Sequence, residues 1–302
     1  MMRSSWLPVV GFCRNRFVPS SLAVLSMLTN SSAPCVGQTV DVSTEVRVLE
    51  DSALGPWIQE RSGRLLLCGG NKLPKSVLDW FFQAGGAEKG SLVIIPTASP
   101  QSDLGDFSRW TTMWKDYRWH DVSVLHAIES DDAKKPEWID MLKDASAVWI
   151  SGGNQQRLVD RYSNTKVLGE LRTLLARGGI VGGTSAGAAV ASKVMIAGGL
   201  TVPRTQEGWG LLPNLIVDQH FSQRGRFERL RNAIQENPTQ FGLGIDEATA
   251  VLITEGHMQV MGHGAAYLFG AESSQIPPLK NGPFASARLK QGDVVRSALS
   301  RE

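Results

Sequence analysis

Short apolar runs alternate with amphipathic segments from about residue 64 onward, and this alternation is the strongest constraint on the fold. The runs RLLLCGG, SLVIIPTAS, VSVLHA, AVWISGG and GGIVGGTS are continuously apolar and lead into loop residues. Helices are predicted between them, as in TKVLGELRTLLARGG, where leucines recur at helical spacing. Continuous apolar strands are buried on both faces. The pattern therefore predicts an α/β fold with a doubly wound, mostly parallel sheet and helices on both faces.

Other segments refine this expectation. KSVLDWFFQAGG, FSRWTTMWKDYRW, PEWIDMLKDA and GRFERLRNAIQEN are helix-like, and LPNLIVDQHF predicts a strand. Residues 243–269 predict short strands with turns at Glu255-Gly256 and Gly262 to Gly264. ARLKQGDVV predicts a last hairpin that turns at Gly292-Asp293. We expect a late antiparallel hairpin region within one domain, residues 41–302, whose core covers about 64–270.

The first 40 residues differ in composition from the rest. Arg3, Arg14 and Arg16 precede a short apolar run and small residues, and the first acidic residue is Asp41. This layout predicts a signal peptide and export to the periplasm or medium, with a disordered leader or an early start codon as alternatives. In those alternatives the protein stays cytoplasmic.

Bulk composition excludes several classes of protein. A formal net charge of +2 over 302 residues gives no indication of a nucleic-acid partner. The longest apolar stretches are too short to span a membrane as a helix. The three cysteines lack metal-ligand spacing, and Cys68 is expected to be a buried, inert thiol. We expect neither a metal nor a cofactor.

The stretch IVGGTSAGAAV places Ser185 in a G-x-S-x-G pattern between a predicted strand and a predicted helix. Small residues two positions before and after the serine permit the sharp turn of a nucleophile elbow. Such a turn exposes the hydroxyl above the carboxyl ends of the strands, where doubly wound sheets bind ligands. The amide of Ala186 would then face an anion forming on a substrate. The pattern predicts a nucleophile, oxyanion contacts and a bound substrate.

The same turn has two other interpretations. It could bind phosphate, or bind no ligand while Ser185 acts as an ordinary helix cap. No lysine follows in P-loop register, and G-x-G-x-x-G is absent from the sequence, which disfavours nucleotide binding.

A serine nucleophile needs a base, and the chain has five histidines. His220 ends the predicted strand LIVDQHF and precedes a basic cluster, whereas the others flank an earlier strand or lie in the late hairpins. We therefore expect His220 to transfer the proton. The acid that would hold it could be Asp246 or Glu247, which period-two geometry sends to opposite faces, or Glu207.

Two further groups predict a binding pocket. Arg224, Arg226 and Arg229 crowd at the start of a helix, where cations oppose the helix dipole, so a carboxylate-binding set is favoured over a solvated surface. In ISGGNQQ, Gly152 and Gly153 allow a backbone amide to approach a ligand, and Gln155 could orient it.

These motifs together resemble the cyanophycinase group of peptidase family S51. SGGNQQRL, GTSAGAAV, MIAGG, GLLPNLIVDQHFSQRGR and LGIDEATA occur in the family's order and cover roughly residues 64–270. The resemblance implies a fold related to class I glutamine amidotransferases and a Ser-His-Glu triad. The triad falls on Ser185, His220 and Glu247. The resemblance also implies six pocket residues: Gln155, Asp218, Gln219, Arg224, Arg226 and Arg229.

The resemblance implies a homodimeric exopeptidase that needs no metal and degrades multi-L-arginyl-poly-L-aspartate to β-Asp-Arg dipeptides. The amides of Gly153 and Ala186 would hold the oxyanion. LTVPRTQE is short for the group, which leaves the substrate open. An aspartyl dipeptidase or a catalytically silent binding homologue are the alternatives, whereas an amidotransferase half is disfavoured because the elbow has no cysteine.

Overall fold

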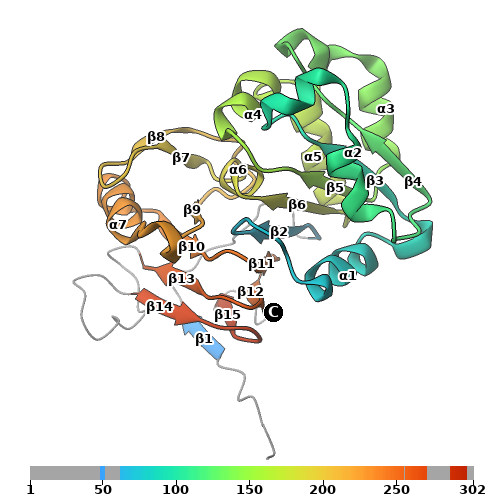
Figure 1. Cartoon of the computed structure of the whole chain (residues 1–302). Coiled ribbons are helices and arrows are strands. Elements are labelled where there is room, and N and C mark those ends of the chain that lie inside the picture. Colours follow the sequence, from blue (N-terminus) through green and yellow to red (C-terminus); the bar gives the residue numbers. More distant parts are fainter. Residues whose placement is uncertain (1–47, 52–61, 255, 271–285, 298–302) are drawn as a thin grey trace, which may run out of the picture. The chain divides into compact units, whose positions relative to one another are not determined.

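The computed structural model describes residues 48–51, 62–254, 256–270 and 286–297 (Figure 1). These residues belong to one compact unit that spans residues 44–302. The predicted leader, residues 1–40, lies outside the described residues. No described helix is both long enough and apolar enough to cross a membrane.

A nine-stranded sheet forms the centre of the fold. Five of its strands are parallel and carry the continuous apolar runs of the sequence, while β11, β12 and β15 extend the sheet in antiparallel pairs. This confirms the predicted mostly parallel sheet with late antiparallel strands. The order across the sheet is β1 (Val48–Asp51), β15 (Val294–Ser297), β12 (His257–Gly262), β11 (Thr249–Ile253), β2 (Arg64–Cys68), β6 (Ile180–Thr184), β5 (Ala147–Ile150), β3 (Ser91–Ile95) and β4 (Asp121–Val124).

Helices cover both faces of this sheet. Alternate residues of β2 enter two different cores, with Leu65 and Leu67 in one and Leu66 and Cys68 in the other. The first core includes residues from α3 (Pro136–Asp144), α4 (Gln155–Tyr162), α5 (Lys166–Ala176) and α6 (Ala186–Ala189). The second includes residues from α1 (Lys75–Ala84) and α2 (Ser108–Thr111). Period-two alternation thus fills a core on each side of the strands.

The segment FSRWTTMWKDYRW does not form the single helix that its pattern predicts. Only the four residues of α2 are α-helical, followed by one 3-10 turn over Thr112–Trp114. Trp110, Trp114 and Trp119 are all buried in the core beside α1. At about 100° per residue, a continuous helix would turn Trp119 to the face opposite Trp110. The chain therefore leaves the helix so that all three indoles reach the same core.

A second sheet stands beside the first and carries α7 (Phe227–Glu236). Leu230 and Ile234 of α7 pack with Ile216 and Phe221 in a core of their own. A two-stranded ribbon completes the fold: β7 (Val194–Gly198) pairs with β8 (Arg204–Glu207). The second sheet has the order β14 (Ser286–Leu289), β13 (Ala266–Phe269), β10 (Phe241–Ile245) and β9 (Leu215–Gln219), of which β9 and β10 are parallel.

The predicted last hairpin is wrong in its pairing. A tight turn forms where expected, with the amide of Asp293 donating to the carbonyl of Lys290 at 3.0 Å. However, β14 pairs with β13 and β15 pairs with β12, so the two strands belong to different sheets. The turn therefore connects the two sheets.

We expect the centre of β2 to be a major source of stability. Leu66 is fully buried, so Leu66→Ala should lower the free energy of unfolding by about 2–5 kcal/mol. Leu200→Ala is the matched control, because Leu200 is 92% exposed and its loss should change that free energy by less than about 0.5 kcal/mol. Urea unfolding followed by circular dichroism measures both. Equal losses in the two variants would contradict this assignment of the core.

Candidate active site

Ser185 lies in a strained turn between β6 and α6. Its backbone has φ 53° and ψ −111°, a conformation that non-glycine residues rarely adopt. A Cβ at Gly183 would lie 2.3 Å from the carbonyl oxygen of Gly187, and one at Gly187 would lie 2.4 Å from that of Ile150. Both flanking glycines are thus required by close backbone packing, as the elbow pattern predicts.

A chain of hydrogen bonds links three side chains from different parts of the sequence. Nε2 of His220 lies 2.9 Å from Oγ of Ser185, and Nδ1 of His220 lies 2.7 Å from Oε1 of Glu247. Nδ2 of Asn71 donates to the other carboxylate oxygen of Glu247 at 2.9 Å. Oδ1 of Asn71 accepts from the amide of Lys72, which orients the Asn71 amide group. Asn71 therefore extends the predicted set of three to four.

The loop after β2 holds this chain of side chains through its main chain. Three successive carbonyls accept from the three loops of the site: Cys68 from the amide of Ser185 at 2.9 Å, Gly69 from His220 at 2.8 Å, and Gly70 from Ala248 at 3.0 Å. Gly70 also lies against the imidazole, since a Cβ there would be 2.2 Å from Cε1 of His220. This short segment thus positions Ser185, His220 and the residue after Glu247 together.

The structure separates the three acidic residues that the sequence left open. Glu247 faces His220, while Asp246 points into the protein and accepts from the amides of Ser222 at 2.9 Å and Ala265 at 3.2 Å. Glu207, at the end of β8, lines a different cavity. The two neighbouring acids therefore do different work: one contacts the imidazole and the other ties loops together.

Burial and charge set the protonation of the site. Burial lowers the pKa of His220 and the nearby cation Arg224 lowers it further, although the bond to Glu247 opposes both effects. The hydrogen bond from Asn71, followed by that with His220, lowers the pKa of Glu247. At neutral pH these shifts favour a neutral imidazole beside an ionised carboxylate. In that state Nδ1 donates to Glu247 and Nε2 is free to accept from Ser185.

Two backbone amides near Ser185 remain available to a ligand. Among the described residues, the amides of Gly153 and Ala186 donate to no protein acceptor. Gly152 faces the serine itself, since a Cβ there would lie 3.2 Å from Cβ of Ser185. Gly153 has φ 145°, and a Cβ on it would overlap the carbonyl of Ala98 at 2.2 Å. Only glycines therefore allow this loop to pass so close to the serine.

The predicted arginine set divides into two kinds of residue. Asp218 is buried and forms ion pairs with Arg226 at 3.3 Å and with Arg229. Arg226 also donates to the carbonyl and the side chain of Gln219 at 2.5 Å each. Arg224 is exposed and makes no ion pair or side-chain hydrogen bond with any described residue. Arg224 is thus the member of the set that is free for a ligand.

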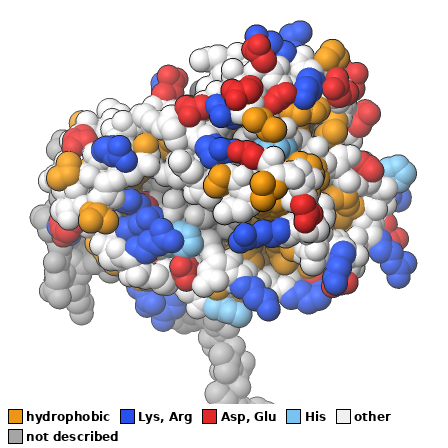
Figure 2. Space-filling view, turned by 45° about the horizontal axis from the view of Figure 1, so that its top comes forward, with side chains coloured by type: hydrophobic (Ala, Val, Ile, Leu, Met, Phe, Trp, Pro, Cys, Tyr) orange, Lys and Arg blue, Asp and Glu red, His pale blue; other side chains and the backbone are white. Residues whose placement is uncertain are grey.

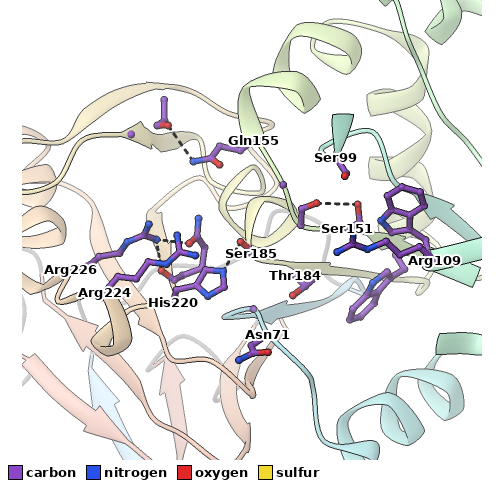
Figure 3. Close-up of a pocket in the computed structure, with 18 of the residues that line it drawn as sticks. Asn71, Ser99, Arg109, Ser151, Gln155, Thr184, Ser185, His220, Arg224 and Arg226 are labelled. Atoms are coloured by element: carbon purple, nitrogen blue, oxygen red, sulfur yellow. Dashed lines mark hydrogen bonds between the residues drawn. The ribbon is translucent and has the colours of Figure 1, made fainter. Parts of the chain in front are cut away.

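These groups surround one cavity of about 580 Å³ (Figure 3). Gln155 lines it and donates to the carbonyl of Ile196 at 2.8 Å. In the space-filling view, basic side chains gather beside a histidine on this side of the protein (Figure 2). No acidic side chain of the described residues lines the cavity. The lining residues that sequence reasoning missed include Asn71, Ser99, Arg109, Trp110, Met113, Trp149 and Ser151.

Nothing in the described part of the chain groups three or more metal-ligating side chains. His126 contacts Thr97 and Asp103, and His257 contacts Thr254, so both have partners outside the site. Cys68 is buried as expected, and burial raises the pKa of its thiol. Within the described residues, the reactive groups of the cavity are therefore Ser185 and His220.

An α/β sheet that presents a serine elbow to a histidine and a glutamate defines a serine hydrolase. The sequence model of peptidase family S51 matches residues 65–261. The chain therefore belongs to peptidase family S51, and it is a serine peptidase.

Similar proteins agree with this family. A cyanophycinase of Trichormus variabilis is 35% identical over 200 residues, which cover 63% of this chain and 67% of the relative. A cyanophycinase of Thermosynechococcus vestitus is 34% identical over 201 residues, covering 63% and 62%. A peptidase E of Nostoc sp. is 24% identical over 216 residues, covering 67% and 86%. The matches thus span about two thirds of these cyanophycinases.

A solved structure supports the fold. The crystal structure of a peptidase from an acI-B1 Actinobacterium matches with a TM-score of 0.59 and 23% identity, and it covers 78% of this chain and 96% of that one. At this identity the likeness concerns the fold alone.

The contact between Gly70 and His220 can be tested by one methyl group. Gly70→Ala should displace the imidazole and lower the rate of labelling of Ser185 by a serine-reactive phosphonate about a hundredfold. Gly105→Ala is the matched control: Gly105 also has a positive φ, but a Cβ there meets nothing within 4 Å. Mass spectrometry of the labelled protein gives both rates. A similar loss in both variants would show that backbone strain, not the imidazole, is responsible.

The pKa shift of His220 predicts the pH dependence of labelling. Protonated His220 cannot accept the proton of Ser185, so labelling falls as pH drops through the pKa of His220. Because that pKa is lowered, the fall should occur below the ordinary value of 6.5. Arg224→Gln removes a cation that lowers this pKa, so the fall should move to higher pH. Lys193→Gln, which removes an exposed cation beside another cavity, should leave the profile unchanged.

Proposed function

We propose that the protein is a cyanophycinase-like exopeptidase, with Ser185 as nucleophile, His220 as general base and Glu247 as the acid that orients it. The observation that carries this proposal is the hydrogen-bonded chain Ser185–His220–Glu247, of which Ser185 and His220 line the cavity. A serine in an elbow, a histidine within 2.9 Å and an anchoring carboxylate are the parts that acyl transfer requires.

The proposed reaction proceeds through an acyl-enzyme. Oγ of Ser185 attacks the scissile carbonyl carbon while its proton passes to Nε2 of His220. The negative charge on the carbonyl oxygen is held by the free amides of Gly153 and Ala186. The C–N bond then breaks as His220 returns the proton to the leaving amine. Water attacks the acyl-enzyme by the same route and releases the acid.

Glu247 supports both steps without taking the proton. It accepts from Nδ1 of His220, so the other ring nitrogen faces Ser185, and its negative charge stabilises the imidazolium that forms. Asn71 donates to Glu247 and fixes the orientation of the carboxylate. We therefore propose Asn71 as a positioning residue that acts through Glu247.

The proposed substrate is multi-L-arginyl-poly-L-aspartate, which would be cleaved to β-Asp-Arg dipeptides. The support is the higher identity to cyanophycinases than to peptidase E, together with the basic cavity. Each unit of this polymer carries the free carboxylate of its arginine, and Arg224 offers an unpaired guanidinium to a carboxylate. Arg226 forms part of the wall next to it, while Asp218, Gln219 and the buried Arg229 hold that wall in place.

A second candidate is an aspartyl dipeptidase of the same family. It is favoured by the cavity lining, in which the described residues offer no carboxylate to a substrate guanidinium. A peptide that carries the carboxylate of aspartate but no guanidinium would bind in this cavity without leaving a cation of its own unpaired. The similarity to a peptidase E of Nostoc sp. also shows that the relatives of this chain are not all named cyanophycinases.

Incubation with purified cyanophycin followed by mass analysis tests the proposal directly. The wild-type protein should release β-Asp-Arg, and Ser185→Ala should lower the rate by at least about a thousandfold. Glu247→Gln should lower it by a similar factor because the imidazole loses its orientation. Release by Ser185→Ala at the wild-type rate would contradict the mechanism. Cleavage of α-linked Asp-Xaa dipeptides instead of the polymer would favour the second candidate.

Labelling with the phosphonate probe distinguishes an active peptidase from a catalytically silent binding protein. Labelling of Ser185 in the folded wild-type protein, and its loss after His220→Ala, is the result expected for an active triad. Absence of labelling in protein that remains folded would support a binding homologue.

A further inference from the structure

Arg109 enters the cavity from the side opposite Arg224 and Arg226. It belongs to α2, on the face of the large sheet that carries α1, whereas Arg224 and Arg226 come from the loop between β9 and α7. Its side chain extends into the cavity toward Ser151, and Ser185 lies between it and the other two arginines (Figure 3). A substrate held at Ser185 therefore has a cation on each side.

Arg109 is also free to bind a ligand. It is exposed and makes no ion pair or side-chain hydrogen bond with any described residue. The nearest carboxylates along the chain have other partners. Asp103 pairs with Arg157 at 2.5 Å and with His126 at 3.2 Å, and Asp106 accepts from the amide of Ser108 at 2.9 Å.

The surroundings of Arg109 suit an anionic group of a peptide. Trp110, Met113 and Trp149 form an apolar wall at this end of the cavity, and the two indoles are almost fully buried. Because an apolar wall excludes water, it strengthens a bond between a guanidinium and a carboxylate. No carboxylate of the described residues lines the cavity to compete for that bond.

From this arrangement we infer that Arg109 binds a second substrate carboxylate, so that the enzyme selects peptides with one carboxylate on each side of the scissile bond. Arg224 binds one of the two and Arg109 the other. The inference rests on the proposed function and adds a specificity determinant to it.

The test compares substrates that differ in one carboxylate. Three synthetic cyanophycin segments are needed: the parent, the C-terminal carboxamide, and one whose arginyl carboxylate next to the scissile carbonyl is a carboxamide. Wild-type kcat/KM should fall by about tenfold or more for each carboxamide. Arg109→Met should abolish one of the two preferences and Arg224→Met the other. The Arg109 effect should fall on KM with little change in kcat, as expected for uniform binding.

Two further variants control for charge and folding. Arg109→Lys keeps the cation and should recover part of the preference lost in Arg109→Met. Lys115→Met removes an exposed cation of the same segment that does not line the cavity, and it should leave both preferences intact. The inference is overturned if Arg109→Met lowers kcat/KM equally for acids and carboxamides, or changes neither.

A binding measurement separates this inference from the proposed function. Calorimetry on Ser185→Ala protein can compare β-Asp-Arg with its fully amidated form, with and without Arg109→Met, and it needs no turnover. Tighter binding of the acid that depends on Arg109 supports the second site even if the polymer is never cleaved, in which case only the proposed substrate fails. Equal affinities in both proteins overturn the second site even if the polymer is cleaved.

Discussion

The active site depends on three consecutive carbonyl groups at the end of β2. Cys68, Gly69 and Gly70 accept hydrogen bonds from Ser185, His220 and Ala248, which belong to three loops far apart in the sequence. Each bond is an ordinary backbone interaction, yet together they set the spacing of the nucleophile, the imidazole and the carboxylate. The next residue, Asn71, adds a side-chain bond to Glu247. Residues 68–71, which take no direct part in the proposed chemistry, thus hold Ser185, His220 and Glu247 in position.

The arginine cluster shows a similar division between support and contact. Asp218 neutralises part of the charge of Arg226 and Arg229 inside the protein and holds both guanidiniums in one geometry. A buried charge without such a partner would be strongly destabilising. Because these residues are ordered in the folded protein, a substrate need not order them on binding, and less of its binding free energy is lost to side-chain entropy. Arg224 and Arg109 are left as exposed cations of the cavity that form no ion pair with any described residue.

Sequence reasoning located the parts of the site that depend on local geometry. The glycines around Ser185 and the strand ending at His220 carry clear signals, because an elbow and a strand end follow from neighbouring residues. Period-two alternation also separated Asp246 from Glu247, while the choice of Glu247 came from the family resemblance. The helix prediction failed at Trp119 because burial of three indoles in one core outweighed helical propensity. The prediction of the last hairpin failed because β14 pairs with β13 and β15 pairs with β12, and these partners belong to different sheets.

The remaining residues could not have been predicted, because their roles depend on distances across the fold. Asn71 and Arg109 follow no motif, and they reach the cavity from the loop after β2 and from α2, respectively. Likewise, the arginine series in the sequence does not reveal that Arg226 and Arg229 form ion pairs with Asp218. That distinction depends on the parallel pairing of β9 with β10, which buries the Asp218 side chain under α7.

Four residues with side chains hold a positive φ around the triad: Asn71, Ser185, His220 and Ala248. Each such conformation is disfavoured by about 1–3 kcal/mol relative to relaxed backbone. Packing in the surrounding sheets must therefore offset the unfavourable free energy of these backbone conformations. Asn71 already carries a residue type that tolerates this conformation. A descendant of this protein that lost its catalytic role would be free to place glycine or asparagine at Ser185, His220 and Ala248, and its fold would become more stable as its activity disappeared. Relaxed residues at these three positions would thus mark an inactive relative even where the rest of the fold is unchanged.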